Sequence, residues 1–363
     1  MWNIFQKKSK SCLGIDIGTS SIKVVQLGRK EEHYKLETYG ELQTYGYLER
    51  LNDPVQTSSL KMLEAQVVEM ITKIIKEAEV NTKNAVLSIP VFSSFVVVID
   101  MPPMSEKEIP QALSFEARRH IPISLSEVRT DWKIVGRETA GTSKDGKKNL
   151  FKFRVLLLAV PNEVINRYLR ITQALNLNLL ALELESFSYI RSLMGKDKSA
   201  TCILDFGSRS TSFTIVDNGF VQASHSLDIA GSELTKALSH GMGVSFQRAE
   251  SYKKERGLNQ MERISGKEVK DILLTLIDRI SIDVERIIVD YQTKTKRRVS
   301  KLILSGGSGN LIGLREYLEK KFKINVIVGS PWNRIVYSSF LASTLKEIAP
   351  RFAVAVGLAM REI

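Results

Sequence analysis

Two segments of the chain carry the same short pattern, and this repetition restricts the fold more than any other feature of the sequence. Aligned on Asp16 and Asp205, each segment reads Asp-x-Gly-[Thr/Ser]-x-Ser. Each also follows a short apolar run and precedes a second run rich in β-forming residues, Ile22–Leu27 and Ser212–Val216. Both segments therefore predict β-hairpins with a glycine-containing turn. Their wide separation indicates two duplicated domains and not a solenoid of short repeats.

The chemistry of an Asp-x-Gly turn suits a phosphate and a metal ion. Gly18 and Gly207 have no Cβ, so backbone N–H groups can approach phosphate oxygens closely. An Asp at the end of a strand can hold a hydrated Mg²⁺. One such turn alone is more often an ordinary hairpin turn. Two matched copies, together with a third glycine turn at Ser305–Gly309, predict a nucleotide site.

Composition limits the classes of function. The chain of 363 residues is long enough for two domains, and its net charge of +12 favours anionic partners such as nucleic acid or a membrane surface. The absence of a recognition motif, of zinc-ligand spacing and of a basic stretch with aromatic residues argues against nucleic acid. Cys12 and Cys202 lie in apolar runs, as expected of reduced core residues in a cytosolic protein. The longest strongly apolar run, Val155–Val160, is far too short to span a bilayer, so we expect a cytoplasmic protein with peripheral membrane association at most.

Between the two hairpins the pattern predicts elements in the order strand, helix, strand, strand. The helix is expected to begin at Ser105, which forms a capping box with Glu108, and to reach about Arg119. In the second half of the chain, a charged helical region is expected over Phe246–Tyr291. The three strands between the hairpins are expected at Phe95–Ile99, Trp132–Arg137 and Phe151–Val160.

The three glycine-containing turns resemble the first phosphate, second phosphate and adenosine motifs of the superfamily of actin, sugar kinases and DnaK-type chaperones. They occur in the expected order, and the resemblance covers nearly the whole chain. It implies an α/β fold of the actin-like ATPase type, in which two ribonuclease-H-like domains close on ATP and Mg²⁺. Asp16 and Asp205 would then hold the Mg²⁺ through water. The cofactor-binding residues carried over to the three turns are Asp16, Gly18, Thr19, Ser20, Ser21, Lys23, Asp205, Gly207, Ser208, Ser210, Gly306, Gly307 and Ser308.

The same resemblance implies further roles on two helices and one strand. Glu250 and Lys253 match a Glu-x-x-Lys pair that edges the adenosine, although an exposed ion pair on a helix face is an equal alternative. Glu185 matches the residue that orients the attacking water, and together with Asp205 it is a candidate catalytic residue. Actins place a His seven residues after the second Asp, where this chain has Ser212. We therefore expect ATP binding with at most slow ATPase activity.

Within the superfamily, three stretches resemble the PilM family of type IV pilus assembly proteins, in its FtsA-like branch. They are Gly14–Val25, the Pro- and Glu-containing stretch from Met101 to Asp131, and Arg351–Arg361. The resemblance implies an ATP-binding component of the inner-membrane assembly complex, at the cytoplasmic face of the inner membrane. Its implied partners are the cytoplasmic N-terminal tail of PilN, docked in a nucleotide-sensitive way, and other inner-membrane and motor components of the pilus. Self-association stays open.

The resemblance also divides the chain into domains. We expect residues 1–84 and 163–198 to form the first ribonuclease-H-like domain, with a C-terminal helix in 350–363 near the hinge. An FtsA-type subdomain is expected over 85–162. The second ribonuclease-H-like domain is expected over 199–349, with a helical subdomain at about 244–299.

Two other functions on the same fold were weighed. A sugar or acid kinase would need a carboxylate base near the γ-phosphate, and no substrate signature of that class is present. A filament-forming cytoskeletal protein of the FtsA or MreB kind is the other alternative. FtsA has a C-terminal amphipathic membrane tail, whereas the sequence stops at Ile363 directly after the closing helix, which favours the PilM family.

Overall fold

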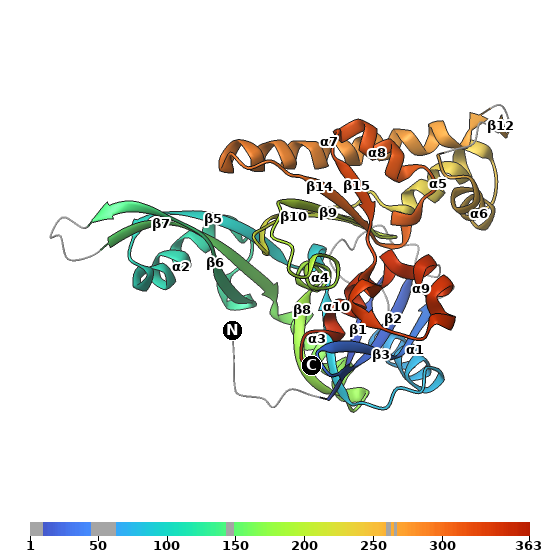
Figure 1. Ribbon diagram of the computed structural model, residues 1–363, viewed down its shortest axis with the longest axis horizontal. Coiled ribbons are helices and arrows are strands. Elements are labelled where there is room, and N and C mark those ends of the chain that lie inside the picture. Colours follow the sequence, from blue (N-terminus) through green and yellow to red (C-terminus); the bar gives the residue numbers. More distant parts are fainter. Residues whose placement is uncertain (1–9, 45–62, 143–148, 259–262, 265–266) are drawn as a thin grey trace.

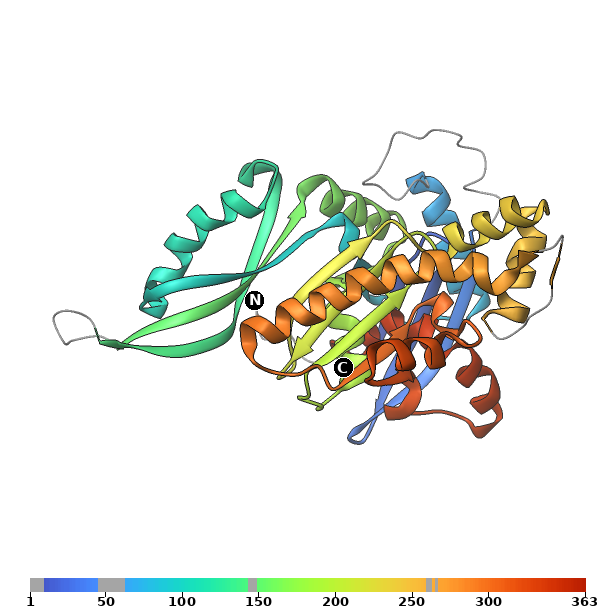
Figure 2. The ribbon, with the colours of Figure 1, turned by 90° about the horizontal axis from the view of Figure 1, so that it is seen from above.

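The computed structural model describes residues 10–44, 63–142, 149–258, 263–264 and 267–363. Two β-sheets with their covering helices lie one above the other in Figure 1, and a third, smaller sheet extends from one side. In Figure 2 the same arm projects to the left, while the long helix α7 (Val269–Thr295) runs across the second sheet. Within the described ranges no helix is both long and apolar enough to cross a bilayer.

The first sheet has six strands in the order β16-β3-β2-β1-β4-β8. Antiparallel hairpins join β1, β2 and β3, whereas β4 and β8 run parallel to β1. The short β16 falls within 199–349, the range expected for the second domain, yet it pairs with β3 at the edge of the first sheet. The strands are β1 (Ser11–Ile17), β2 (Ser21–Lys30), β3 (His33–Gln43), β4 (Asn84–Ile89), β8 (Asn178–Leu184) and β16 (Ile335–Val336).

The second sheet repeats the plan of the first. Its five strands have the order β11-β10-β9-β14-β15, with β9, β10 and β11 antiparallel and β14 and β15 parallel to β9. Order and direction match the first sheet strand for strand when β16 is left aside. The duplication inferred from two short turns therefore extends to both whole sheets. The strands are β9 (Thr201–Phe206), β10 (Thr211–Asp217), β11 (Phe220–Leu227), β14 (Lys301–Ser305) and β15 (Asn325–Val328).

The third sheet forms the arm and has the antiparallel order β5-β7-β6. Helix α2 (Ile109–His120) packs on it through apolar residues that include Ile109 and Leu113. The predicted capping box is confirmed, because the backbone N–H of Ser105 donates to Glu108 Oε2 at 2.7 Å, and a short 3₁₀ turn precedes α2. The order strand, helix, strand, strand is also confirmed. The strands are β5 (Phe95–Met104), β6 (Val128–Thr142) and β7 (Asn149–Pro161).

Helices cover both main sheets. α1 (Glu64–Glu77) and α3 (Asn162–Ala174) contribute buried residues to one core with the first sheet, and α5 to α8 do so with the second. The charged helical region expected over Phe246–Tyr291 consists of two helices, because α6 (Phe246–Arg256) ends at Gly257 and α7 begins at Val269. The helices not yet given bounds are α5 (Gly231–Met242), α8 (Leu314–Phe322) and α9 (Ala342–Ile348).

The C-terminal helix α10 (Ala353–Ala359) lies in an apolar core to which both main sheets contribute. Two glycines allow this helix to approach its neighbours. A Cβ at Gly14 of β1 would lie 2.1 Å from the Ala355 carbonyl oxygen, and a Cβ at Gly357 would lie 1.9 Å from the Ser188 carbonyl oxygen of α4 (Glu185–Tyr189). The buried Cys12 and Cys202 are both free thiols, and Cys12 belongs to this shared core, as the sequence predicted.

Candidate functional site

The two Asp-x-Gly turns have the same backbone geometry. Asp16 pairs with Lys23 across β1 and β2, and Asp205 pairs with Ser212 across β9 and β10. A Cβ at Gly18 would lie 2.8 Å from the carbonyl oxygen three residues on, and a Cβ at Gly207 would lie 2.7 Å from the equivalent oxygen. Since both distances are shorter than side-chain carbons tolerate, both turns require glycine for the same reason.

The carboxylate of the first turn has partners inside the protein. Asp16 is buried, Ser88 Oγ of β4 donates to its Oδ1 at 2.9 Å, and Lys23 Nζ lies 3.8 Å from its Oδ2. Lys23 is itself buried, and its Nζ lies 3.6 Å from the position that a Cβ of Gly18 would occupy. The structure therefore places Lys23 directly at the first turn.

The other residues of the first turn are held by neighbouring strands. Thr44 donates from its hydroxyl to the Thr19 carbonyl at 2.6 Å and from its backbone N–H to the Ser20 carbonyl at 2.9 Å. The buried Ser21 donates its hydroxyl to Glu41 at 2.8 Å, so this hydroxyl supports the turn. Gly18, Thr19 and Ser20 are half-buried.

The carboxyl group of the second turn, Asp205, has no counterpart of Lys23 beside it. Ser305 pairs with Asp205 across β14 and β9 and donates its hydroxyl to the Pro350 carbonyl at 3.1 Å. Among the described residues no Lys or Arg lies within ion-pair distance of Asp205. Burial and then the charge of Asp16 raise the pKa of Asp205 to about 6, although Ser305 and Lys23 act in the opposite direction. The anionic form of Asp205 is thus less favourable than that of an exposed Asp, and an added cation would stabilise it.

Glu185 supplies a third carboxyl group to the same region. It begins α4 directly after β8, and its Oε2 accepts a hydrogen bond of 3.2 Å from the backbone N–H of Val91. Burial, followed by the charges of Asp16 and Asp205, raises the pKa of Glu185 well above its ordinary value. Three carboxyl groups from two sheets and one helix therefore act on one another, and Lys23 is the cation that opposes them. Such a set favours an added cation.

Tyr168 of α3 is a buried polar residue that the sequence did not single out. Its hydroxyl is fully buried and lacks a hydrogen-bond partner among the described residues. Burial, and then the charges of Glu185 and Asp16, raise the pKa of this hydroxyl. Helical spacing in the sequence marks Tyr168 as a core residue and carries no signal for a polar contact.

The third glycine turn closes against the second. Gly306 has φ +81°, and a Cβ there would lie 2.5 Å from the Phe206 carbonyl oxygen and 2.9 Å from Asp205 Oδ1. A Cβ at Gly307 would meet nothing within 4 Å, so the backbone at this position faces open space. Ser308 Oγ lies 2.5 Å from the Cβ position of Gly231, the first residue of α5. The turn therefore combines a tightly packed glycine with an accessible one.

The N-terminus of α5 is bonded to the second turn. The backbone N–H of Gly231 donates to the Gly207 carbonyl at 3.0 Å, and that of Ser232 donates to the Ser208 carbonyl at 2.8 Å. Lys253 Nζ donates to the Gly231 carbonyl at 2.9 Å and contacts Glu250 at 2.7 Å. These bonds fix the helix start beside the turn.

The Glu250–Lys253 pair is not an exposed ion pair. Lys253 is buried, and burial lowers its pKa even though Glu250 acts in the opposite direction. Burial also opposes the charged form of Glu250, but Lys253 and the hydroxyl of Thr235 hold the pKa of this carboxyl below its ordinary value. The alternative of a solvated helix face is therefore wrong. A contact of either side chain with adenosine stays a prediction.

Ser212, at the position equivalent to Lys23, contacts the side chain of Tyr189. The hydroxyl of the buried Tyr189 lies 3.4 Å from Ser212 Oγ and 3.4 Å from Thr214 Oγ1. Burial, and then the charge of Asp205, raise the pKa of Tyr189. The second turn thus has neutral hydroxyl groups where the first has an ammonium group.

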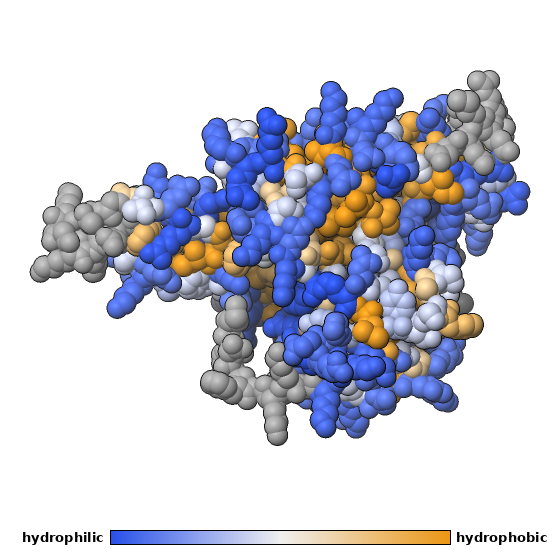
Figure 3. Space-filling model, viewed as in Figure 1, coloured by the Kyte–Doolittle hydropathy of each residue, from blue (hydrophilic) through white to orange (hydrophobic). Residues whose placement is uncertain are grey.

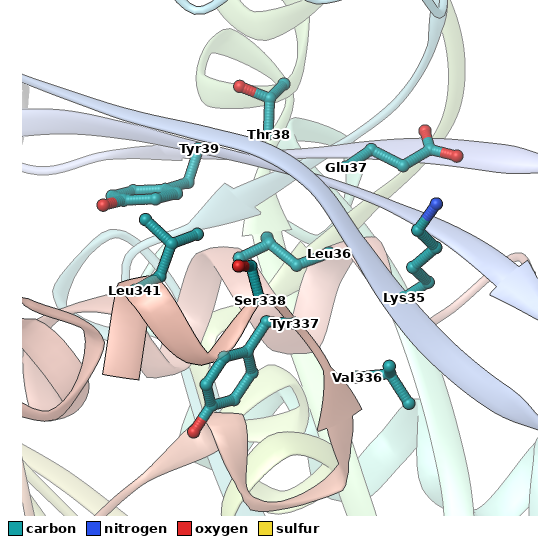
Figure 4. Close-up of a pocket in the computed structure, with 9 residues that line it drawn as sticks. All are labelled: Lys35, Leu36, Glu37, Thr38, Tyr39, Val336, Tyr337, Ser338 and Leu341. Atoms are coloured by element: carbon teal, nitrogen blue, oxygen red, sulfur yellow. The ribbon is translucent and has the colours of Figure 1, made fainter. Parts of the chain in front are cut away.

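A cavity of about 510 Å³ lies elsewhere, between β3 and residues 336–341 (Figure 4). Leu36 and Tyr39 line it from β3, and Tyr337 and Leu341 line it from the facing segment. It contains none of the predicted site residues. Figure 3 shows that the face viewed in Figure 1 is largely hydrophilic, with apolar residues gathered near the middle.

Comparison with known proteins decides the family. The family model of the type IV pilus assembly protein PilM matches residues 14–363. The chain belongs to the PilM family. This PilM-family chain is also 20% identical over 218 residues to the cell division protein FtsA of Staphylococcus epidermidis, an alignment that covers 54% of the chain and 46% of FtsA. The chain thus spans about half the length of this relative.

Solved structures confirm the fold of this PilM-family chain. A structure of the PilM–PilN type IV pilus biogenesis complex has a TM-score of 0.79 at 22% identity, and covers 98% of this chain and 99% of the other. MreB 5 of Spiroplasma citri bound to AMPPNP has a TM-score of 0.55 at 12% identity, and covers 97% of this chain and 95% of the other. The predicted actin-like ATPase fold, with its FtsA-type inserted subdomain, is therefore confirmed.

Proposed function

We propose that this PilM-family pilus assembly component binds ATP with Mg²⁺ between its two Asp-x-Gly turns. The observation that carries the proposal is the set of three interacting carboxyl groups, Asp16, Asp205 and Glu185, opposed by the one ammonium group of Lys23. Within the described residues no three His, Cys, Asp or Glu side chains are grouped as direct ligands of a metal ion. Asp16 and Asp205 would therefore hold Mg²⁺ through its water molecules, as is usual for this ion.

The remaining predicted site residues would bind different parts of the nucleotide. Backbone N–H groups of the two turns and the hydroxyls of Thr19, Ser20, Ser208 and Ser210 would bind phosphate oxygens, and Lys23 would add a positive charge. The open backbone at Gly307, with Gly306 and Ser308, would receive the adenosine. Bound Mg²⁺ neutralises charge on the phosphates, while Glu185 would orient a water molecule toward them.

Slow turnover is the expected chemistry. Ser212 and Tyr189 present hydroxyl groups at the second turn, and neither is a base at neutral pH. Burial and the neighbouring carboxylates raise the pKa of Glu185 and so favour its neutral form, and a neutral carboxyl group is a poor acceptor for a proton from water. ATP would accordingly act mainly as a conformational ligand.

We further propose that the chain works at the cytoplasmic face of the inner membrane by docking the N-terminal tail of PilN in a nucleotide-sensitive way. Family membership and the likeness to the PilM–PilN complex support this partner. The net charge of +12 suits a protein held near anionic lipid head groups through a membrane partner.

A pull-down with a PilN tail peptide, with and without ATP and Mg²⁺, tests this docking. A peptide of the same composition in scrambled order is the control. We expect the native peptide to be retained, in an amount that depends on the nucleotide. Equal retention of both peptides, or of neither under either condition, would reject the PilN proposal and leave the nucleotide proposal to its own tests.

A further inference from the structure

A short connector joins the first sheet to the inserted subdomain. The 3₁₀ turn η1 (Val91–Ser93) follows β4 and leads into β5. Val91 and Ser93 are buried, and the hydroxyl and N–H of Ser94 both donate to the Val91 carbonyl, at 2.9 Å and 3.1 Å. The connector is therefore a compact unit and not a loose loop. A change in the position of η1 would therefore also move the start of β5.

Residues of the candidate nucleotide site contact η1 from two directions. Glu185, from the first-sheet side, accepts the hydrogen bond of the Val91 N–H. Arg209, which stands between Ser208 and Ser210 in the second turn, places its guanidinium carbon 5.2 Å from the centre of the Phe92 ring. This distance is within the range of a cation–π interaction. One three-residue connector thus contacts both halves of the site.

The inserted subdomain and its connector also contact β11 of the second sheet, and part of this contact is remote from the turns. Gln222 of β11 donates to the Val135 carbonyl of β6 at 3.4 Å, and Lys133 Nζ lies 4.7 Å from the centre of the Phe220 ring. The two contacts use the same kind of interaction, a cation over a phenylalanine ring. Only the Arg209–Phe92 contact involves a residue of a predicted phosphate turn, so the Phe220 contact provides a matched control.

We propose that the Arg209–Phe92 contact couples the nucleotide site to the inserted subdomain, an inference that rests on the proposed ATP binding. Arg209 lies beside hydroxyl and N–H groups that would bind phosphate, and its long side chain can reach either the ring or an anion. A charge-assisted hydrogen bond to phosphate is stronger than a cation–π contact in a partly accessible place. Bound ATP therefore draws Arg209 from Phe92 and loosens η1 and the start of β5. The subdomain thereby responds to nucleotide.

Hydrogen exchange of the backbone amides of residues 91–99 tests the proposal on the full chain. In the wild type, saturating ATP and Mg²⁺ should accelerate this exchange by about two- to five-fold, the factor expected from losing one contact of this strength. Phe92→Leu keeps an apolar side chain at this half-buried position but removes the ring. It should bind ATP as the wild type does, show the faster exchange without nucleotide, and show no further change with ATP.

Two further variants and calorimetry separate the outcomes. Phe220→Leu removes the control ring and should keep the wild-type response, while Arg209→Gln should lose the response even if its ATP affinity falls. A wild-type response in Phe92→Leu, or ATP binding by the wild type without change at residues 91–99, would overturn the coupling alone. Absence of ATP binding by the wild type in calorimetry would overturn the proposed function and the coupling with it.

Discussion

The two Asp-x-Gly turns have the same backbone and different electrostatics. In both, a glycine packs against a carbonyl three residues on, and the Asp pairs across a hairpin with the residue seven positions later. In the first turn that residue is Lys23, which neutralises Asp16; in the second it is Ser212, and the pKa of Asp205 is raised to about 6. The two turns thus share their backbone geometry, but the turn at Asp205 lacks a cation like Lys23. The second turn is the half at which the proposed Mg²⁺ would supply the missing positive charge.

The largest effect should follow from removing the cation of the first turn. Lys23→Met keeps most of the side-chain volume but leaves Asp16 buried without a counter-charge, which should lower the free energy of unfolding by about 3 kcal/mol. Urea denaturation measures this change. Ser212→Met, at the equivalent position, adds volume without removing a charge and is the matched comparison for packing. Stability of Lys23→Met equal to the wild type would contradict the neutralising role of Lys23.

The shared backbone predicts equal effects of alanine in the two turns. Gly18→Ala and Gly207→Ala each place a Cβ less than 3 Å from a carbonyl oxygen, so each should cost about 2 kcal/mol in unfolding free energy. Gly219→Ala is less informative as a control because Gly219 has positive φ. Gly307→Ala meets no atom within 4 Å and should cost much less. A large difference between the first two variants, in urea denaturation, would show that the turns are not equivalent.

The opposite electrostatics predict opposite effects of amide substitution. Asp205→Asn removes a carboxyl group whose folded pKa is raised, so it should stabilise the ligand-free protein by about 1–2 kcal/mol at pH 8. Asp205 binds its proton more tightly in the folded state than in the unfolded state. The destabilisation caused by ionised Asp205 is therefore complete above pH 6 and disappears below about pH 4. The gain should therefore shrink on acidification. Asp16→Asn weakens the ion pair with Lys23 and should lower the free energy of unfolding. If urea denaturation shows that both variants change this free energy in the same direction, the two turns do not differ electrostatically as described.

The smallest effect is expected at the position equivalent to Lys23 in the second turn. Ser212→Ala removes a hydroxyl whose contact with Tyr189 is long, 3.4 Å, so the free energy of unfolding should change by less than about 1 kcal/mol. Affinity for ATP should change less than about two-fold, as calorimetry would show. A loss of binding like that expected for a residue of the phosphate turn would mean that Ser212 contacts the ligand.

Local sequence patterns predicted much of this fold. Alternating apolar runs around glycine turns identified both hairpins, and the pair Ser105–Glu108 identified the start of a helix, because these signals depend on neighbours in the chain. The pairing of β16 with β3 could not be predicted from the sequence, because a strand of two residues has no detectable periodicity.

The contacts that complete the site were not predictable from the sequence. Glu183 and Glu185 stand two residues apart, yet Glu183 is bonded by Arg191 and Arg361 at 2.8 Å, which lowers its pKa against the effect of burial, while the pKa of Glu185 is raised. The Phe92–Arg209 contact likewise joins distant parts of the chain. Such differences arise from tertiary packing, because only the folded chain determines which charges meet.

The most direct test of the nucleotide site is the rise in melting temperature caused by ATP and Mg²⁺ in the wild type and in Asp16→Ala. Ligand that binds the folded state raises its stability in proportion to the logarithm of the ligand concentration over Kd. Asp100→Ala, which removes an exposed carboxylate on the arm, is the control and should behave as the wild type. We predict that the rise seen in the wild type disappears in Asp16→Ala. An equal rise in Asp16→Ala would contradict a site between the two turns.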